Sequence, residues 1–284
     1  MSSLSGNLRK MQVSLPENPQ QAVNYQMVLG DHRLPLNEFI GQQLQLIYEG
    51  QIGCVHCGRA TKKSFNQGYC YPCFKSLAQC DQCIVSPERC HYDAGTCREP
   101  EWADEFCMQD HYVYLANSSG LKVGITRGTQ IPTRWIDQGA SQALAIYRVS
   151  TRLYAGLVEV VFKQHMSDKT HWQAMLKGSP EPLDLKQIVE NLMPEIEPEI
   201  AQLQKQYGLQ AIQHCDDAST VHIQFPVLEY PVKVKSLNFD KTPKISGKLM
   251  GIKGQYLILD TGVLNLRKFG GYYLDVRLDV SLDT

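Results

Sequence analysis

Hydrophobic and polar residues alternate with a period of two in three short runs near the start of the chain. These runs are LRKMQVSL, YQMVLG and LQLIYEGQI, and such alternation is typical of half-buried β-strands. Pro16, Pro19 and Gly30 lie between them and indicate turns. We therefore predict that residues 1–53 form a β-rich segment.

The last part of the chain shows the same alternation. The runs are TVHIQFPVLEYPVKV, KISGKLMGIKGQYLILDTGVLNLRKF and GYYLDVRLDV, and their glycines mark turns or bulges. Neither terminal segment has enough strands for a stable barrel of its own, and the ends of a chain often lie close together. We therefore predict that residues 1–53 pair with residues 218–284, and that everything between them is an insertion.

The middle of the chain changes to a mixed pattern. Tyr112 to Ala116 and Leu121 to Thr126 are β-branched and aromatic runs separated by a polar turn, which predicts a β-hairpin. A helix is expected from Thr133 onwards, capped by Thr133 or Thr129, and the run ALAIYRVS predicts a further strand. Residues 111–217 thus read as a small α/β unit.

Two more helices are expected in this unit. In TRLYAGLVEVVFKQHM, apolar residues recur at helical spacing. DLKQIVENLMPEIEPEIAQLQKQYG is a long amphipathic helix that Pro194 or Pro198 could break. The fold class predicted for the whole chain is α+β, with a terminal β-rich domain, an inserted zinc-ribbon-like region at 54–110 and the small α/β domain at 111–217.

Composition limits the function classes. The chain has 284 residues, of which 43% are hydrophobic and 20% charged, so it is expected to fold. A net charge of -1 gives no overall attraction to nucleic acid, and any such site must be a local basic patch. Basic residues do outnumber acidic ones between His111 and Lys177. There is no apolar run of membrane-spanning length and no signal-peptide pattern, which favours a cytoplasmic protein without a membrane partner.

Ten cysteines in a chain without a secretion signal favour metal binding over disulfides, because the cytosol keeps thiols reduced. Cys54-Val-His-Cys57 and Cys70-Tyr-Pro-Cys73 are two CxxC pairs at a spacing typical of a tetrahedral zinc site. Four thiolates would complete the coordination of the ion. We therefore predict a structural zinc here, with no open position for catalysis.

A second zinc is expected a little further along the chain. Cys80, Cys83, Cys90 and Cys97 provide four thiolates, but their spacing is irregular. The pattern therefore leaves three alternative ligands open, which are His91, Cys107 and His111. Two structural zinc ions per chain are the expectation.

Four residues carry candidate catalytic chemistry: Tyr114, Lys122, Arg134 and Glu159. The first hairpin strand carries YVY (residues 112–114) and the second carries KVG (residues 122–124). Because of these two motifs and the four residues, residues 111–175 resemble the GIY-YIG nuclease superfamily. Together with the cysteine pairs, the pattern is more similar still to a prokaryotic domain-of-unknown-function family, number 2797. Lys122 departs from the superfamily pattern, which has a second tyrosine there.

The resemblance implies a metal-dependent endonuclease that acts on DNA or RNA. Glu159 would hold Mg²⁺ or Mn²⁺, Arg134 would hold the phosphate, and Tyr114 would orient or deprotonate the attacking water. Tyr114 would need a nearby cation to lower its pKa, and Lys122 would supply that cation. The alternative is a non-catalytic zinc-ribbon adaptor that binds nucleic acid or protein.

Overall fold

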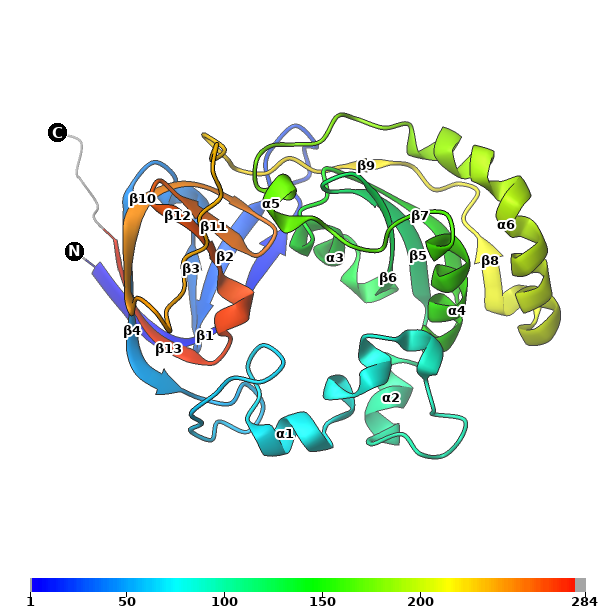
Figure 1. Cartoon of the computed structure of the whole chain (residues 1–284), viewed down its shortest axis with the longest axis horizontal. Coiled ribbons are helices and arrows are strands. Elements are labelled where there is room, and N and C mark those ends of the chain that lie inside the picture. The colour runs from blue at the N-terminus through cyan, green and yellow to red at the C-terminus, as the bar shows by residue number, and fades with distance from the viewer. Residues whose placement is uncertain (1, 279–284) are drawn as a thin grey trace.

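The computed structural model describes residues 2–278 and contains two antiparallel sheets joined by a cysteine-bearing region (Figure 1). One sheet, at the left in Figure 1, contains both ends of the described chain. The other, at the right, is covered by helices. The mixed α+β class predicted from the sequence is confirmed at this level.

The first sheet has eight strands in the order β12-β11-β10-β4-β13-β1-β2-β3. Strand β1 pairs with β13 from Ser2↔Leu278 to Asn7↔Tyr273, and β13 also pairs with β4. Segments from the two ends of the chain therefore share one sheet. Its strands are β1 (Ser2–Ser14), β2 (Asn24–Leu29), β3 (His32–Pro35), β4 (Gln43–Ile52), β10 (Lys244–Lys253), β11 (Tyr256–Leu259), β12 (Gly262–Asn265) and β13 (Tyr272–Leu278).

One stretch differs from the sequence prediction. Residues 223–243 were expected to be strand-rich, but they form no strand. They meet the sheet through the isolated bridges Val227↔Gly251 and Ser236↔Val263, and Phe239 packs in its core. Pro226 and Pro231 interrupt this stretch, and a proline cannot donate a ladder hydrogen bond. The segment instead runs along the first sheet, and its apolar residues alternate because some of them pack against that sheet.

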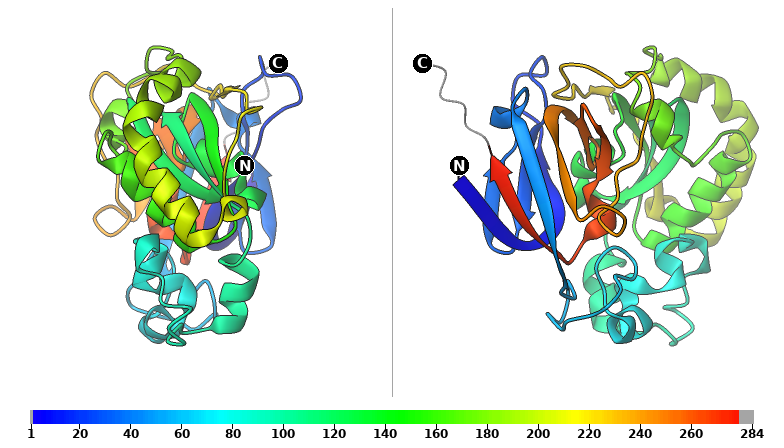
Figure 2. Two further views of the ribbon diagram at one scale, coloured as in Figure 1. Left: turned by 90° about the vertical axis from the view of Figure 1, so that its right-hand side faces the viewer. Right: turned by 60° about the vertical axis from the view of Figure 1, so that its left-hand side comes forward.

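The second sheet has five strands: β6-β5-β7-β8, with β9 also paired to β7. Helices α4 and α6 cover its outer face, where their apolar side chains join one buried cluster with those of β5 and β7 (Figure 2). The strands are β5 (His111–Asn117), β6 (Leu121–Arg127), β7 (Gln142–Val149), β8 (Ile212–His214) and β9 (Val221–His222), and the helices are α3 (Thr133–Asp137), α4 (Arg152–Lys163), α5 (Trp172–Met175) and α6 (Leu185–Tyr207).

Local predictions had mixed outcomes in this half. β5 and β6 form the expected hairpin, but α3 has Pro132 at its N-cap and no side-chain cap, so the threonine caps are wrong. Helix α6 runs without a break through Pro194 and Pro198. Both prolines lie on its exposed side, so water can bind the carbonyls that lose their helical partner. The buried Ile196 and Ile200 hold the opposite side against the sheet.

The cysteine region connects the two sheets and lies below both in Figure 1. It contains α1 (Tyr71–Ser76), α2 (Pro100–Phe106) and several single-turn 3-10 helices. Arg9 of β1 donates to the carbonyl of Val55, and Arg152 of α4 donates through Nη2 to the carbonyl of Ile84 at 2.6 Å. The region is therefore attached to a strand of the first sheet and to a helix on the second.

The sheets also meet directly, at α3. The carboxylate of Asp137 pairs with Lys10 of β1 and accepts from Gln255 Nε2 at 2.8 Å. Trp135 and Ile136 of the same helix belong to the core of the first sheet. Among residues 2–278, no helix has the combined length and apolar character of a membrane crossing.

Candidate functional site

The first two cysteine pairs form a compact cluster. The sulfur atoms of Cys54, Cys57, Cys70 and Cys73 all lie within 4.8 Å of one another, and those of Cys57 and Cys70 are 3.8 Å apart. Four thiolates at this spacing suit a tetrahedral zinc ion, which would be fully coordinated. The cluster could therefore bind one zinc, with a structural role.

Local backbone geometry creates this cluster. The amide of Gly58 donates to the carbonyl of Cys54 at 3.0 Å, and the amide of Cys70 donates to the Cys54 sulfur at 3.2 Å. Burial would raise the pKa of Cys54, but amide donors of Cys57, Cys70 and His56 outweigh it and lower the pKa to about 6. Burial and the neighbouring sulfurs raise the pKa of Cys73. The site thus favours the thiolate form of Cys54 but not that of Cys73. A bound cation would stabilise all four cysteines as thiolates.

The second predicted zinc set does not come together in the described residues. The group found there is Asp81, Cys83 and His91, whose ligand atoms lie within 4.8 Å of one another. Cys80 packs instead in the buried cluster of the first site. Asp81 also pairs with Arg98 at 2.8 Å. Of the expected ligands only Cys83 belongs to this group, together with His91, one of the alternatives left open.

The remaining expected ligands lie outside both groups. Cys90 and Cys97 are half-buried, and Cys107 is buried. His111 is buried at the start of β5, where its Nδ1 lies 2.7 Å from the carbonyl of Gln109. Burial lowers the pKa of His111 to about 4, so its ring is neutral at physiological pH.

A cavity of about 420 Å³ lies where the three parts of the chain meet. Lys10 and Arg267 border it from the side of the first sheet, and Ile84, Val85 and Pro87 border it from the cysteine region. The remaining walls come from the second sheet and its helices and connections. Seven basic side chains line the cavity against three acidic ones, which are Lys10, Lys122, Arg127, Arg134, Arg152, Lys163 and Arg267 against Asp137, Glu159 and Asp168. The cavity therefore has the local positive charge that the whole chain lacks.

Four of these cations have no acidic partner among residues 2–278, and they are Lys122, Arg127, Arg134 and Arg152. Among residues 2–278, neither Lys122 nor Arg134 has a carboxylate oxygen within 4.0 Å. Burial, and then Arg134, lowers the pKa of Lys122 to about 8, although Asp168 and Glu159 oppose the shift. Lys122 is buried and Arg134 is exposed, and a buried cation without a counter-charge is costly unless an anion binds it. This part of the cavity is thus arranged to receive one.

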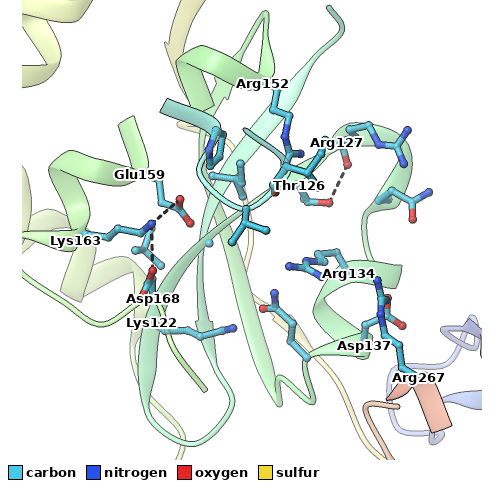
Figure 3. Close-up of a pocket in the computed structure, with 18 of the residues that line it drawn as sticks. Lys122, Thr126, Arg127, Arg134, Asp137, Arg152, Glu159, Lys163, Asp168 and Arg267 are labelled. Atoms are coloured by element: carbon cyan, nitrogen blue, oxygen red, sulfur yellow. Dashed lines mark hydrogen bonds and ion pairs between the residues drawn. The ribbon is translucent and has the colours of Figure 1, made fainter. Parts of the chain in front are cut away.

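Glu159 lies across the cavity from Arg134 (Figure 3). Its carboxylate is 3.0 Å from Lys163 Nζ, which is also 3.1 Å from Asp168, so one ammonium group lies between two carboxylates. Burial raises the pKa of Glu159 despite Lys163. The predicted metal ligand is thus in the cavity, but a lysine already neutralises it.

Tyr114 lies just beneath the cavity floor. It pairs with Gly124 across the hairpin, its ring covers that glycine, and its hydroxyl donates to Gln138 Oε1 at 3.0 Å. Burial raises its pKa to about 12, and Arg134 only moderates the shift. The expectation that Lys122 lowers this pKa is therefore reversed: Tyr114 stays protonated at neutral pH and can donate a hydrogen bond, but it is a poor base.

Comparison with known proteins was made over the full chain. The profile of a family described as "Protein of unknown function (DUF2797)" matches residues 41–274. The chain belongs to this family. Searches of curated proteins and of solved structures found no match. The family resemblance predicted from the cysteine pairs is thus confirmed, whereas none of these comparisons links the chain to GIY-YIG nucleases, and that part stays a prediction.

The DUF2797 match covers nearly all of the described site. It begins at the start of β4 and ends within β13, so it includes the four-cysteine cluster and every cavity residue except Lys10. Sequence reasoning gave no role to Lys10, Lys163 or Arg267. Lys163 had a local signal, because it follows Glu159 by four residues on one helix face. Lys10 and Arg267 had none, since they reach the cavity only through the packing of the two sheets.

Proposed function

We propose that the cavity binds the phosphodiester backbone of DNA or RNA and that the protein is a zinc-stabilised, metal-dependent nuclease of the GIY-YIG type. One observation carries this proposal. Lys122 and Arg134, two cations without a carboxylate partner, line the same cavity as Glu159, which lies on its opposite side. The Arg134 guanidinium can hold a phosphate by paired hydrogen bonds.

Lys122 fits the role of general base better than Tyr114 does. A base works best when its pKa is close to the working pH, and the pKa of Lys122 is about 8 whereas that of Tyr114 is about 12. In this scheme the neutral amine of Lys122 takes a proton from water and the water oxygen bonds to phosphorus. The bond from phosphorus to the leaving oxygen then breaks, and the leaving oxygen takes a proton from solvent. The Tyr114 hydroxyl keeps Gln138 in place at the cavity floor.

A divalent metal fits the acidic side of the cavity. The carboxylates of Glu159 and Asp168 already share one cation, the Lys163 ammonium, and carboxylate oxygens are the ligands that magnesium prefers. A magnesium or manganese ion held by Glu159 would supply charge neutralisation at the phosphate and the leaving oxygen. Lys163 would have to move aside for such an ion.

The test is cleavage of labelled single-stranded, double-stranded and branched DNA and RNA with Mg²⁺ or Mn²⁺. We expect Glu159→Gln to lower the cleavage rate at least about a hundredfold, while nucleic-acid binding is retained because a negative charge is removed from a basic cavity. Arg134→Ala should weaken both. Cleavage by Glu159→Gln at the wild-type rate would contradict the proposal.

A second candidate function is a non-catalytic nucleic-acid adaptor. It is favoured by two observations, the Lys163 ammonium on Glu159 and the protonated, buried Tyr114. In this case the wild-type protein binds a substrate of the panel but leaves all of them intact with either metal. Loss of Lys122 or Arg134 then only weakens salt-sensitive binding.

A further inference from the structure

A second basic hollow adjoins the cavity. This side groove has a volume of about 590 Å³ and shares Lys10 and Arg267 with the cavity, so the two hollows are neighbours. Its other walls come from β1, from the turn between β2 and β3, and from the cysteine-region loop at residues 66–69. The groove therefore leads away from Arg134 and onto the first sheet.

The side groove is positively charged along its length. Arg9, Lys10, Arg33 and Arg267 line it, against the single acid Asp31. Arg33 is exposed, and its guanidinium bonds only the carbonyls of Gly30 and His32, at 3.3 and 3.0 Å. No carboxylate of residues 2–278 lies within 4.0 Å of it. Such a row of cations suits successive phosphates of an extended chain.

The size of the cavity limits what can reach Arg134. Cavities for drug-sized ligands are about 300–1,000 Å³, so the 420 Å³ here suits one nucleotide-sized unit. A B-form duplex has a major groove about 12 Å wide and is wider still as a whole. The cavity is bordered by the first sheet, the cysteine region and the second sheet with its helices. A single unpaired strand therefore fits it better than a whole duplex.

The cysteine-region wall also offers an apolar contact. Val85 lines the cavity and is 81% exposed, beside Ile84. An exposed apolar side chain in a cavity lined by cations can cover the apolar face of an unpaired base whose phosphate lies on the basic side. In a duplex that base would be stacked and paired.

We propose that the cavity and the side groove bind single-stranded nucleic acid, with one phosphate at Lys122 and Arg134 and the following ones along Lys10, Arg267 and Arg33. This inference rests on the proposed function and adds the substrate class. It places part of the binding site on the first sheet, outside the region that resembles a nuclease.

The test is fluorescence anisotropy of the full chain without added divalent metal. The probes are a labelled oligothymidine strand of about 12 nucleotides, an oligouridine strand of the same length, and the blunt thymidine–adenine duplex. Arg33→Glu is the groove variant. Lys186→Glu is the matched control, because it makes the same charge change at an exposed position on the far side, on α6.

We expect at least one single strand to bind about tenfold more tightly than the duplex. Arg33→Glu should weaken that binding roughly fivefold and lower the salt slope by about 0.7 for each lost phosphate contact, whereas Lys186→Glu should change it less than about twofold. If the duplex binds as tightly as the strands, or if Arg33→Glu behaves like Lys186→Glu, this inference is wrong while nucleic-acid binding stands. If no probe binds, the proposed function fails as well.

Discussion

At the scale of single residues, the acidic groups of the cavity are paired with cations, whereas some of its basic groups are not paired with acids. Glu159 and Asp168 share Lys163, and Asp137 pairs with Lys10, whereas no carboxylate oxygen of residues 2–278 lies within 4.0 Å of Lys122 or Arg134. Burial then separates the ionisation behaviour of the two candidate bases. It moves the pKa of Lys122 down towards neutrality and the pKa of Tyr114 away from it.

Lys122 gives a prediction about pH. Its pKa is lowered to about 8, so the neutral amine is half populated near pH 8 and becomes rarer as pH falls. We expect the single-turnover cleavage rate to rise about tenfold per pH unit below this value and to level above it. Lys122→Arg stays charged and should lose cleavage at least about a hundredfold, with binding changed less than about threefold. An arginine variant that keeps the wild-type pH profile would show that Lys122 is not the base.

Lys163 gives a prediction about metal. Its ammonium lies 3.0 Å from Glu159 and 3.1 Å from Asp168, so it competes with any metal at these carboxylates. Lys163→Met should raise manganese affinity about tenfold and should destabilise the metal-free fold by about 1–3 kcal/mol, because it leaves buried charge unpaired. Isothermal titration with Mn²⁺ and chemical denaturation measure the two effects. Lys177→Met, at an exposed position, is the control, and equal manganese affinity in both variants would remove Glu159 as a metal ligand.

At the scale of elements, local sequence signals were sufficient where an element is determined by its own residues. The hairpin β5–β6 follows from β-branched runs around a polar turn, and α4 begins where Thr151 accepts from the amide of Tyr154. Local sequence signals were misleading where tertiary packing determines the conformation of a segment. Residues 223–243 alternate like a strand but form no strand and meet the sheet through two isolated bridges, and α6 continues through its prolines because its other face is buried.

Gly124 gives a prediction about the hairpin. The Cβ of any larger residue would lie 2.7 Å from the Tyr114 hydroxyl, so this strand position needs a glycine. Gly124→Ala should push the ring off Gln138 and lower the free energy of unfolding by about 1–3 kcal/mol. Gly178→Ala is the control, because a Cβ there meets nothing within 4 Å, and it should change stability by less than about 0.5 kcal/mol. Equal denaturation midpoints for the two variants would contradict this account of the KVG strand.

At the scale of the whole molecule, the cavity exists because three regions meet. The cysteine region forms one wall, and it is held against α4 at two points. Arg152 donates to the carbonyl of Ile84, and Gly156 leaves room for Glu88, whose amide would be 2.5 Å from an added Cβ. No local pattern indicates these contacts, so sequence reasoning found the four cysteines but not the cavity that their region helps to enclose.

Zinc binding should therefore control the cavity from a distance. Cys57→Ser removes one of four ligands at the cluster, and we expect the bound zinc to fall from about one per chain to near zero, because three remaining ligands hold the ion much less tightly. The cysteine region should then exchange its amide hydrogens faster and detach from Arg152. Nucleic-acid binding should weaken about tenfold. The cysteine region supplies none of the basic residues of the cavity, but it forms one of the walls that hold the bound strand in place.

Elemental analysis, hydrogen exchange and anisotropy together measure this chain of effects. Cys215→Ser is the control, because that thiol belongs to neither metal-ligand group in residues 2–278 and should leave zinc content and binding unchanged. Cys57→Ser could lose zinc and exchange amide hydrogens faster at residues 54–110, yet bind nucleic acid with full affinity. That result would show that the cysteine-region wall is dispensable and that the basic residues alone form the binding site. Retention of zinc by Cys57→Ser would instead move the metal away from the four-cysteine cluster.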